Sequence, residues 1–295
     1  MPFRLCFFYY FCIKLNHGDM DVYDIKDKWN ATIVAIMRRF IEICKENNLR
    51  YYCCGGTAIG AIRHKGLIPW DDDIDVMMPR PDYDRLIEIA KTADWGDYEL
   101  ITPYNNDTYP LYFSKISDKR TTLIEYPNIP CTIGLYIDIF PLDGSADTLD
   151  EAKHLKDKFV KQINRLSAIS TRSTFAEHIA LLKDRKEWGR FVIKTIAWFC
   201  RPTVRRYLIR KMDELSHIYD YENAKYVALH TGSYSYKEIL PKEWLGEGSI
   251  HTFEGMEVVL PKEYDTYLRQ VFGDYMQLPP EDKRCSHHEK TFIKI

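Results

Sequence analysis

The sequence contains few of the patterns that usually assign a protein to a class. It has no long apolar run, since segment 5–13 is shorter than half of the roughly 20 residues that span a bilayer, and no small-residue cleavage site follows it. It has no internal repeat and no low-complexity linker. Its eight cysteines include no C-x-x-C pair, which excludes a zinc ribbon and a thioredoxin-like redox motif. Unpatterned cysteines in a chain of 295 residues are typical of a reduced, cytoplasmic protein.

Four common ligand-binding or catalytic motifs are missing as well. An EF-hand loop that starts at Asp71 would need glycine at Val76 and glutamate at Asp82. A Walker A loop that starts at Gly55 would need lysine followed by serine or threonine at 61–62. The dinucleotide fingerprint G-x-G-x-x-G and the nucleophile elbow G-x-S-x-G are absent. These absences exclude an EF-hand calcium site, a P-loop nucleotide site, a dinucleotide-binding fingerprint and the nucleophile elbow of serine hydrolases.

The chain also lacks an excess of charge of one sign. Its formal net charge is −2, which gives no indication of a nucleic-acid partner. A hydrophobic content of 45% can fill a core. We expect one domain over 22–295, preceded by an extension at 1–21. Two readings of that extension stay open: sequence upstream of a natural start at Met20, or a weak membrane anchor.

What the sequence does contain is a dense run of glycine, basic and acidic residues. Gly55-Gly56 follows a predicted strand at 49–54, Arg63-His64-Lys65 comes next, and four aspartates then fall between 71 and 75. Carboxylates this close repel one another, and burying any of them without a counter-charge costs several kcal/mol, about 2–7. A divalent metal ion removes that cost, and the basic residues indicate that phosphate accompanies it. The run therefore predicts the site of a metal-dependent phosphotransfer enzyme.

Strand geometry selects among the aspartates. Segment 71–78 is predicted to be a strand, on which Asp72 faces away from the other three aspartates because successive side chains alternate between faces. Asp138 lies on a second, otherwise aliphatic strand at 133–140. Carboxylates from two neighbouring strands can hold Mg²⁺ or Mn²⁺. The predicted metal ligands are Asp71, Asp73, Asp75 and Asp138, and the last three are also the predicted catalytic residues.

Candidate substrate contacts surround these carboxylates in the sequence. A glycine turn lets phosphate approach backbone N–H groups, and a guanidinium suits bidentate pairing with a diphosphate. A solvated basic turn is the alternative reading of the Arg-His-Lys triplet. The predicted substrate-binding residues are Gly55, Gly56, Thr57, Arg63, His64, Lys65 and Lys115.

The remaining pattern predicts an α+β protein with a mixed sheet flanked by helices. We expect a helix at 24–47, hairpins at 112–126 and 253–260, and a helical insertion at about 150–220. Segment 183–211 of that insertion holds ten lysines or arginines against two acidic residues, and Pro202 is expected to interrupt its helix. It is either a basic, apolar surface for an anionic membrane or a core-facing helix with a solvated basic rim.

Several stretches resemble one family closely. They are GGTAIGAIRHKG at 55–66, PWDDDIDV at 69–76, KISDK at 115–119 and YIDIFPLDG at 136–144. The chain is similar to the LicD family of phosphocholine transferases, which have the nucleotidyltransferase fold and are related to fukutin and the fukutin-related protein. The resemblance covers roughly 22–290.

The resemblance implies a function as well as a fold. It implies transfer of phosphocholine, or a similar phospho-substituent, from CDP-choline or a related donor to a hydroxyl of a glycan or lipid-linked glycan, with Mg²⁺ or Mn²⁺ as cofactor. Asp73, Asp75 and Asp138 match the family's metal-binding carboxylates. The implied location is the cytoplasm or the inner face of the membrane. One alternative is a nucleotide-sugar glycosyltransferase that uses Asp73-Ile74-Asp75 as a lone metal motif, and another is a non-catalytic relative.

Overall fold

The computed structural model describes residues 22–126, 128–171, 179–284 and 292–294, so the predicted extension 1–21 lies outside the described residues. The helices are α2 (Val22–Glu46), α3 (Gly55–Arg63), α4 (Arg80–Ala90), α5 (Leu149–Ser170), α7 (Trp188–Ser216) and α8 (Tyr264–Phe272). The short 3-10 helices are η1 (Leu181–Lys183), η2 (Arg185–Glu187), η3 (Ser235–Glu238), η4 (Lys242–Trp244) and η5 (Glu281–Lys283). The strands are β1 (Tyr52–Cys53), β2 (Asp75–Pro79), β3 (Tyr98–Ile101), β4 (Ser114–Ile124), β5 (Ile133–Ala146), β6 (Tyr226–Ala228), β7 (Ile239–Pro241), β8 (Ser249–Phe253), β9 (Met256–Leu260) and β10 (Phe292–Lys294).

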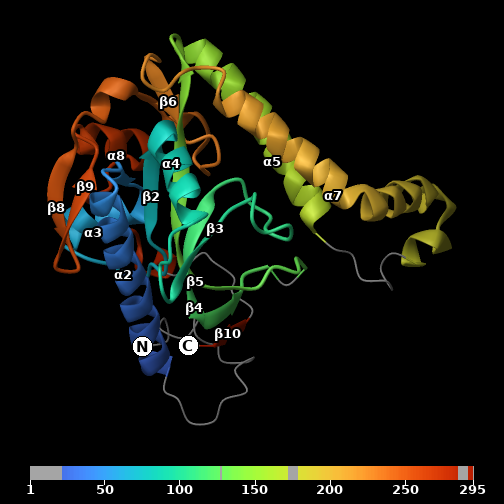
Figure 1. The fold of residues 1–295 in the computed structure, drawn as a ribbon, viewed down its shortest axis with the longest axis horizontal. Coiled ribbons are helices and arrows are strands. Elements are labelled where there is room, and N and C mark those ends of the chain that lie inside the picture. The colour runs from blue at the N-terminus through green and yellow to red at the C-terminus, as the bar shows by residue number, and fades with distance from the viewer. Residues whose placement is uncertain (1–21, 127, 172–178, 285–291, 295) are drawn as a thin grey trace.

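One mixed sheet forms the centre of the molecule (Figure 1). Its strand order is β1-β2-β5-β4-β10, with β3 paired to β4 and β6 to both β5 and β7. β2 and β5 are parallel, and the neighbouring pairs β1–β2 and β4–β5 are antiparallel. β5 pairs with β2, β4 and β6, so it fixes the position of most of the sheet. The α+β prediction is confirmed.

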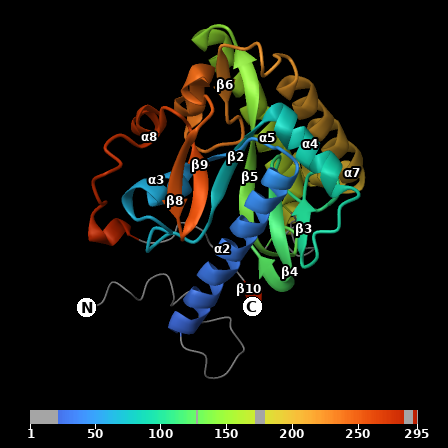
Figure 2. The same ribbon diagram turned by 60° about the vertical axis from the view of Figure 1, so that its left-hand side comes forward.

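Helix α2 covers one face of this sheet, across β4 and β5 (Figure 2). Its apolar residues recur every three or four positions, which puts them on one side of the helix. Ile33, Ile36 and Phe40 on that side are fully buried, and burial of such side chains contributes about 1.5–3 kcal/mol each. The hairpin of β8 and β9 lies with α3 and α8 at the β1–β2 edge (Figure 2).

The predicted helical insertion forms α5 and α7, which pack side by side (Figure 1). Pro202 lies inside α7, so the prediction that it interrupts this helix is wrong. Arg205, three residues later, donates from Nη2 to the carbonyls of Pro103, Asn106 and Tyr109 at 2.9–3.0 Å. These three tertiary hydrogen bonds hold the helix in place and compensate for the one backbone hydrogen bond that proline removes. Among the helices described, none combines the length and the apolar content needed to cross a membrane.

Two strand predictions also need correction. The prediction of a hairpin at 112–126 is wrong, because β4 runs through 117–120 without a turn. The pairing of β4 with β5 instead changes register between Asp118 and Leu123. Asp118 is held there by Arg120, whose Nη2 lies 2.6 Å from its Oδ2. β5 likewise continues to Ala146, beyond the predicted end at Phe140, because its last residues pair with β6. The predicted hairpin at 253–260 is confirmed as part of β8–β9.

Candidate active site

Three adjacent strands place one charged residue each in the same row. In the parallel pair β2–β5, Asp75 lies opposite Asp138, and in the antiparallel pair β4–β5, Lys115 lies opposite Asp138. Side chains of directly paired residues project to the same face of a sheet. The sheet therefore brings together two predicted metal ligands and the predicted phosphate-binding lysine.

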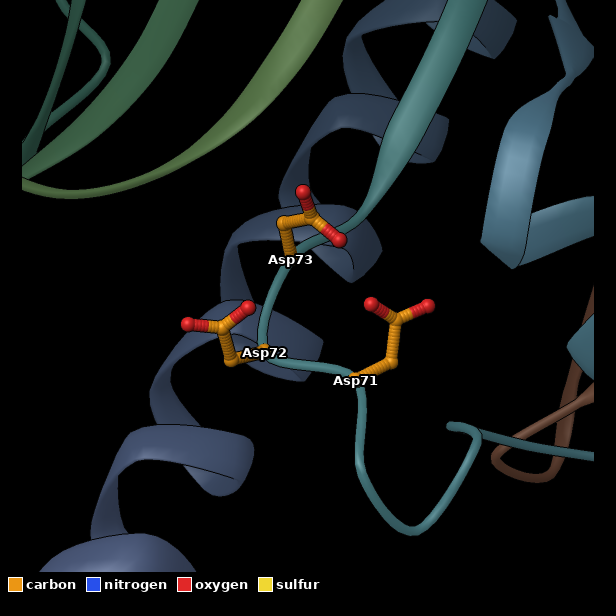
Figure 3. Close-up of side chains that lie close together, drawn as sticks. All are labelled: Asp71, Asp72 and Asp73. Atoms are coloured by element: carbon orange, nitrogen blue, oxygen red, sulfur yellow. The ribbon is translucent and has the colours of Figure 1, made fainter. Parts of the chain in front are cut away.

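The other aspartates lie in the irregular segment that leads into β2. That strand begins at Asp75, so the alternation that was expected to separate Asp72 from its neighbours does not apply to 71–74. One carboxylate oxygen from each of Asp71, Asp72 and Asp73 lies within 4.8 Å of the other two. In Figure 3 the Asp72 carboxylate leaves the chain on the other side from that of Asp71. We call Asp71, Asp72, Asp73, Asp75 and Asp138 the acidic site.

The glycine pair packs directly against two of these carboxylates. A Cβ atom on Gly55 would lie 2.7 Å from Oδ2 of Asp75, and one on Gly56 would lie 2.1 Å from Oδ2 of Asp71. Gly55 also has a φ of +56°, a conformation that favours glycine. Thr57 completes the contact, since its Oγ1 accepts a hydrogen bond from Asp75 N at 2.8 Å. The first turn of α3 thus positions the acidic site.

Negative charge is concentrated at a partly buried site, in which Asp72 and Asp138 are buried and the other three aspartates are half-buried. Burial and the charges of Asp73, Asp138 and Asp71 raise the pKa of Asp75 well above its ordinary value. Burial also raises the pKa of Asp138, to about 6, although the Lys115 ammonium opposes that rise. The carboxylates are thus held close together at a cost that a cation would remove.

Lys115 is the positive charge inside this arrangement. Its side chain is fully buried, and its Nζ lies 2.7 Å from Oδ1 of Asp138 and 3.3 Å from the ring centroid of Tyr136. Glu125 lies 3.6 Å from the same ammonium. The structure thus places Lys115 on a carboxylate rather than on an open surface, and one lysine faces several acidic groups.

Glu125 was missed by the sequence reasoning. It follows β4, ten positions after Lys115, and the register shift in that strand decides where it lies. That shift lies between Asp118 and Leu123, and no pattern in the sequence marks it. Glu125 is thus found only from the structure.

The basic triplet lies at the opposite end of α3. A nine-residue helix is about 13.5 Å long, and Arg63 is its last residue. Nη1 of Arg63 donates to the carbonyls of Tyr275 and Gln277 at 2.5 and 3.2 Å. The His64 ring meets Trp70 edge to face at 5.9 Å, and Lys65 is exposed in a turn with a φ of +61°. The structure therefore does not bring these three side chains into the acidic site.

Comparison with known proteins bears on the family. Residues 48–171 match the family model described as LicD/FKTN/FKRP, nucleotidyltransferase domain, and every predicted site residue falls within that range. The lipopolysaccharide cholinephosphotransferase LicD of Haemophilus influenzae is 30% identical over 262 residues, which cover 86% of this chain and 92% of that protein. The chain belongs to the LicD family. This relationship confirms the prediction of a transferase of phosphorus-containing groups.

Two further relatives match shorter parts of the chain. An uncharacterized protein of Rickettsia prowazekii is 32% identical over 88 residues, 30% of this chain and 33% of its own length. Mannosyltransferase regulator 4 of Saccharomyces cerevisiae is 23% identical over 145 residues, 46% of this chain and 12% of its own length. Neither adds an activity to the one carried by the LicD relative.

Proposed function

We propose that this LicD-family chain transfers phosphocholine, or a similar phospho-substituent, from a CDP-activated donor to a hydroxyl of a cell-surface glycan. The observation that carries the proposal is the meeting of Asp75 and Asp138 on paired strands, with the first turn of α3 packed against them. The name of the Haemophilus influenzae relative, a lipopolysaccharide cholinephosphotransferase, supports phosphocholine as the group and a lipopolysaccharide-type glycan as the acceptor.

The proposed reaction is a substitution at phosphorus. The acceptor hydroxyl oxygen forms a bond to the phosphorus that carries choline, and the bond from that phosphorus to the bridging oxygen of the diphosphate breaks. CMP leaves with the bridging oxygen, and the hydroxyl proton passes to a carboxylate of the acidic site. Gly55, Gly56 and Thr57 are proposed contacts of the donor phosphates, because a helix N-terminus favours anions.

The residues present fit Mg²⁺ or Mn²⁺. Both ions prefer oxygen ligands, and burial together with the charges of the neighbouring carboxylates raises the pKa of Asp75, an effect that a cation would oppose. Asp73, Asp75 and Asp138, helped by Asp71, would hold the ion, which when bound supplies positive charge to the donor diphosphate. Lys115 keeps Asp138 in place through their ion pair, and Arg63, His64 and Lys65 have no part in this proposal.

The reaction is tested with labelled CDP-choline, Mg²⁺ and lipopolysaccharide of defined structure. We expect release of CMP and labelled glycan, and we expect a chelator to abolish both. Release of UDP from a nucleotide sugar, with no CMP from any CDP-alcohol, would instead identify the glycosyltransferase alternative. Binding of CDP-choline without turnover under all metal conditions would identify a non-catalytic relative.

We also propose that the chain acts at the cytoplasmic face of a membrane, which it contacts through the start of α7. This part of α7 projects away from the sheet (Figure 1). Large apolar side chains recur along it at helical spacing and are exposed: Trp188, Val192, Ile196 and Phe199, the last at 81%. Basic residues dominate 183–211, which adds attraction to anionic lipid.

Vesicle flotation tests this contact. We expect the protein to float with phosphatidylcholine vesicles that contain phosphatidylserine, and Phe199→Ser to reduce the bound fraction severalfold. Ile250→Ser is the matched control, because Ile250 is 70% exposed on β8, away from α7. Equal loss in both variants, or no flotation of the wild type, would refute the contact and leave the transferase proposal unaffected.

A further inference from the structure

The segment between β6 and β7 is folded back on a buried ion pair. Nζ of Lys156, from α5, donates to the carbonyl of Leu229 at 2.8 Å and lies 3.1 Å from Oε2 of Glu238. That same oxygen accepts a hydrogen bond from the backbone N of Tyr234 at 3.0 Å. Lys156 and Glu238 are both buried. One ion pair thus fixes the start, the middle and the end of 229–238, which we call the β6–β7 loop.

The β6–β7 loop keeps its shape at a cost. A Cβ atom on Gly232 would lie 2.0 Å from Oε1 of Glu238, and Ser235 has a φ of +56°, a region that costs a non-glycine residue about 1–3 kcal/mol. Both ring nitrogens of His230 and the hydroxyl of Thr231 are buried without a hydrogen-bond partner among the described residues, which costs further free energy. Local strain of this kind concentrates where a loop holds a ligand.

The loop packs Tyr234 against α8, the helix that contacts the first turn of α3. The Tyr234 ring packs edge-on against Phe272 at the end of α8, with centroids 4.8 Å apart. Tyr267 of the same helix accepts a hydrogen bond from Gly55 N at 3.4 Å, and Gly55 is the residue that packs against Asp75. Burial raises the pKa of the Tyr234 phenol, and the charges of Asp75, Glu238, Asp71 and Asp73 add to that rise. The side chain nevertheless stays 47% exposed.

We propose that Tyr234 recognises the trimethylammonium group of the donor through the face of its ring, which makes it a specificity residue of the reaction proposed above and rests on that reaction. A quaternary ammonium has no N–H to donate, so aromatic faces and surrounding negative charge are what recognise it. Tyr234 has a half-exposed ring, and α8, against which that ring packs, contacts Gly55 next to Asp75. The ion pair of Lys156 and Glu238 holds that ring in place before the donor arrives.

A donor series tests this role. CMP release is measured with CDP-choline, CDP-ethanolamine and CDP-glycerol for wild type, Tyr234→Ala, Tyr234→Phe and Tyr236→Ala. We expect Tyr234→Ala to raise the KM for CDP-choline roughly 5- to 30-fold and to leave CDP-glycerol unchanged. Tyr234→Phe keeps the ring and should match wild type. Tyr236 lies two positions on, with its hydroxyl on Asp157 at 2.7 Å, so Tyr236→Ala serves as the control and should not discriminate among donors.

Other outcomes overturn the assignment. An equal loss of CMP release with all three donors would mean that the ring contacts the cytidine that they share. A loss of CMP release in Tyr234→Phe would mean that the hydroxyl, and not the ring face, contacts the donor. Titration calorimetry with phosphocholine and glycerol phosphate gives a readout without turnover. A preference for phosphocholine that disappears in Tyr234→Ala supports the inference even if no donor is turned over, in which case the transferase proposal alone fails. Absence of that preference in wild type rejects the inference.

Discussion

Two groups of buried charge lie along the same pair of strands, β2 and β5, and they differ in how charge is balanced. At the start of β2, Asp75 and Asp138 lie in one row of the sheet with a single buried lysine, Lys115, and Glu125 lies 3.6 Å from the same ammonium. Just beyond the end of β2, Arg80 Nε lies 2.6 Å from Oδ1 of Asp143. That second group, with Lys156 and Glu238, pairs each cation with an anion, and we call it the paired cluster.

The difference separates structural charge from functional charge. In a buried ion pair each charge offsets part of the cost of burying the other, so removal of one partner alone is expensive. A buried group with an excess of negative charge is relieved when it takes up a proton or when an external cation joins it. We therefore expect substitutions in the paired cluster to change folding, and substitutions in the acidic site to change activity.

The largest effect is expected for Arg80→Met. The substitution leaves Asp143 buried without its partner, so the free energy of unfolding should fall by about 3–5 kcal/mol. Urea denaturation measures this change. Arg80→Met/Asp143→Leu removes both charges and should recover most of the loss. A double variant as unstable as the single one would show that Arg80 stabilises the fold through contacts other than its ion pair with Asp143.

Asp75→Asn should have the opposite profile. We expect CMP release to fall on the order of 100-fold, because a charged ligand of the proposed ion is lost. The free energy of unfolding without metal should stay the same or rise, because one repelling charge is gone. Parallel activity and denaturation measurements check both parts. Full activity in Asp75→Asn, or a strong loss of stability, would remove the distinction between the two groups.

The contrast was only partly predictable from the sequence. The α2 helix and the apolar face of β5 follow from local spacing, and Asp138 was found because it interrupts an aliphatic strand. The pairing of Arg80 with Asp143 depends on the parallel register of β2 and β5, which local patterns do not encode. Pro202 was misread for a related reason: bonds from Arg205 to a distant loop hold its helix.

The third prediction concerns pH and the paired cluster. His230 stacks on Phe159 with ring centroids 4.2 Å apart, and burial with the charges of Lys156 and Arg80 lowers its pKa well below the usual value. The unfolded chain therefore takes up a proton near pH 6.5 that the folded protein does not. From pH 7 to pH 5 this should reduce the free energy of unfolding by about 2 kcal/mol.

His230→Phe isolates that contribution. Phenylalanine keeps the stack on Phe159 and has no titrating group, so its stability should fall less than that of the wild type as the pH drops. Urea denaturation of both proteins at pH 7, 6 and 5 measures the difference. Parallel profiles would mean that another group of the molecule carries the acid sensitivity.

The smallest effect is expected for Gly56→Ala, which probes the contact of α3 with the acidic site. The added Cβ would lie 2.1 Å from Oδ2 of Asp71, so the carboxylate must shift and CMP release should fall about tenfold, as displaced catalytic groups commonly cause losses of this size or larger. Gly189→Ala in α7 is the matched control. No atom of the described residues lies within 4 Å of the position that its added methyl group would occupy. This substitution should leave CMP release unchanged and stabilise the helix by up to about 1 kcal/mol. If Gly56→Ala kept full activity, Asp71 would be free to move without consequence, and the proposed ligands would reduce to Asp73, Asp75 and Asp138.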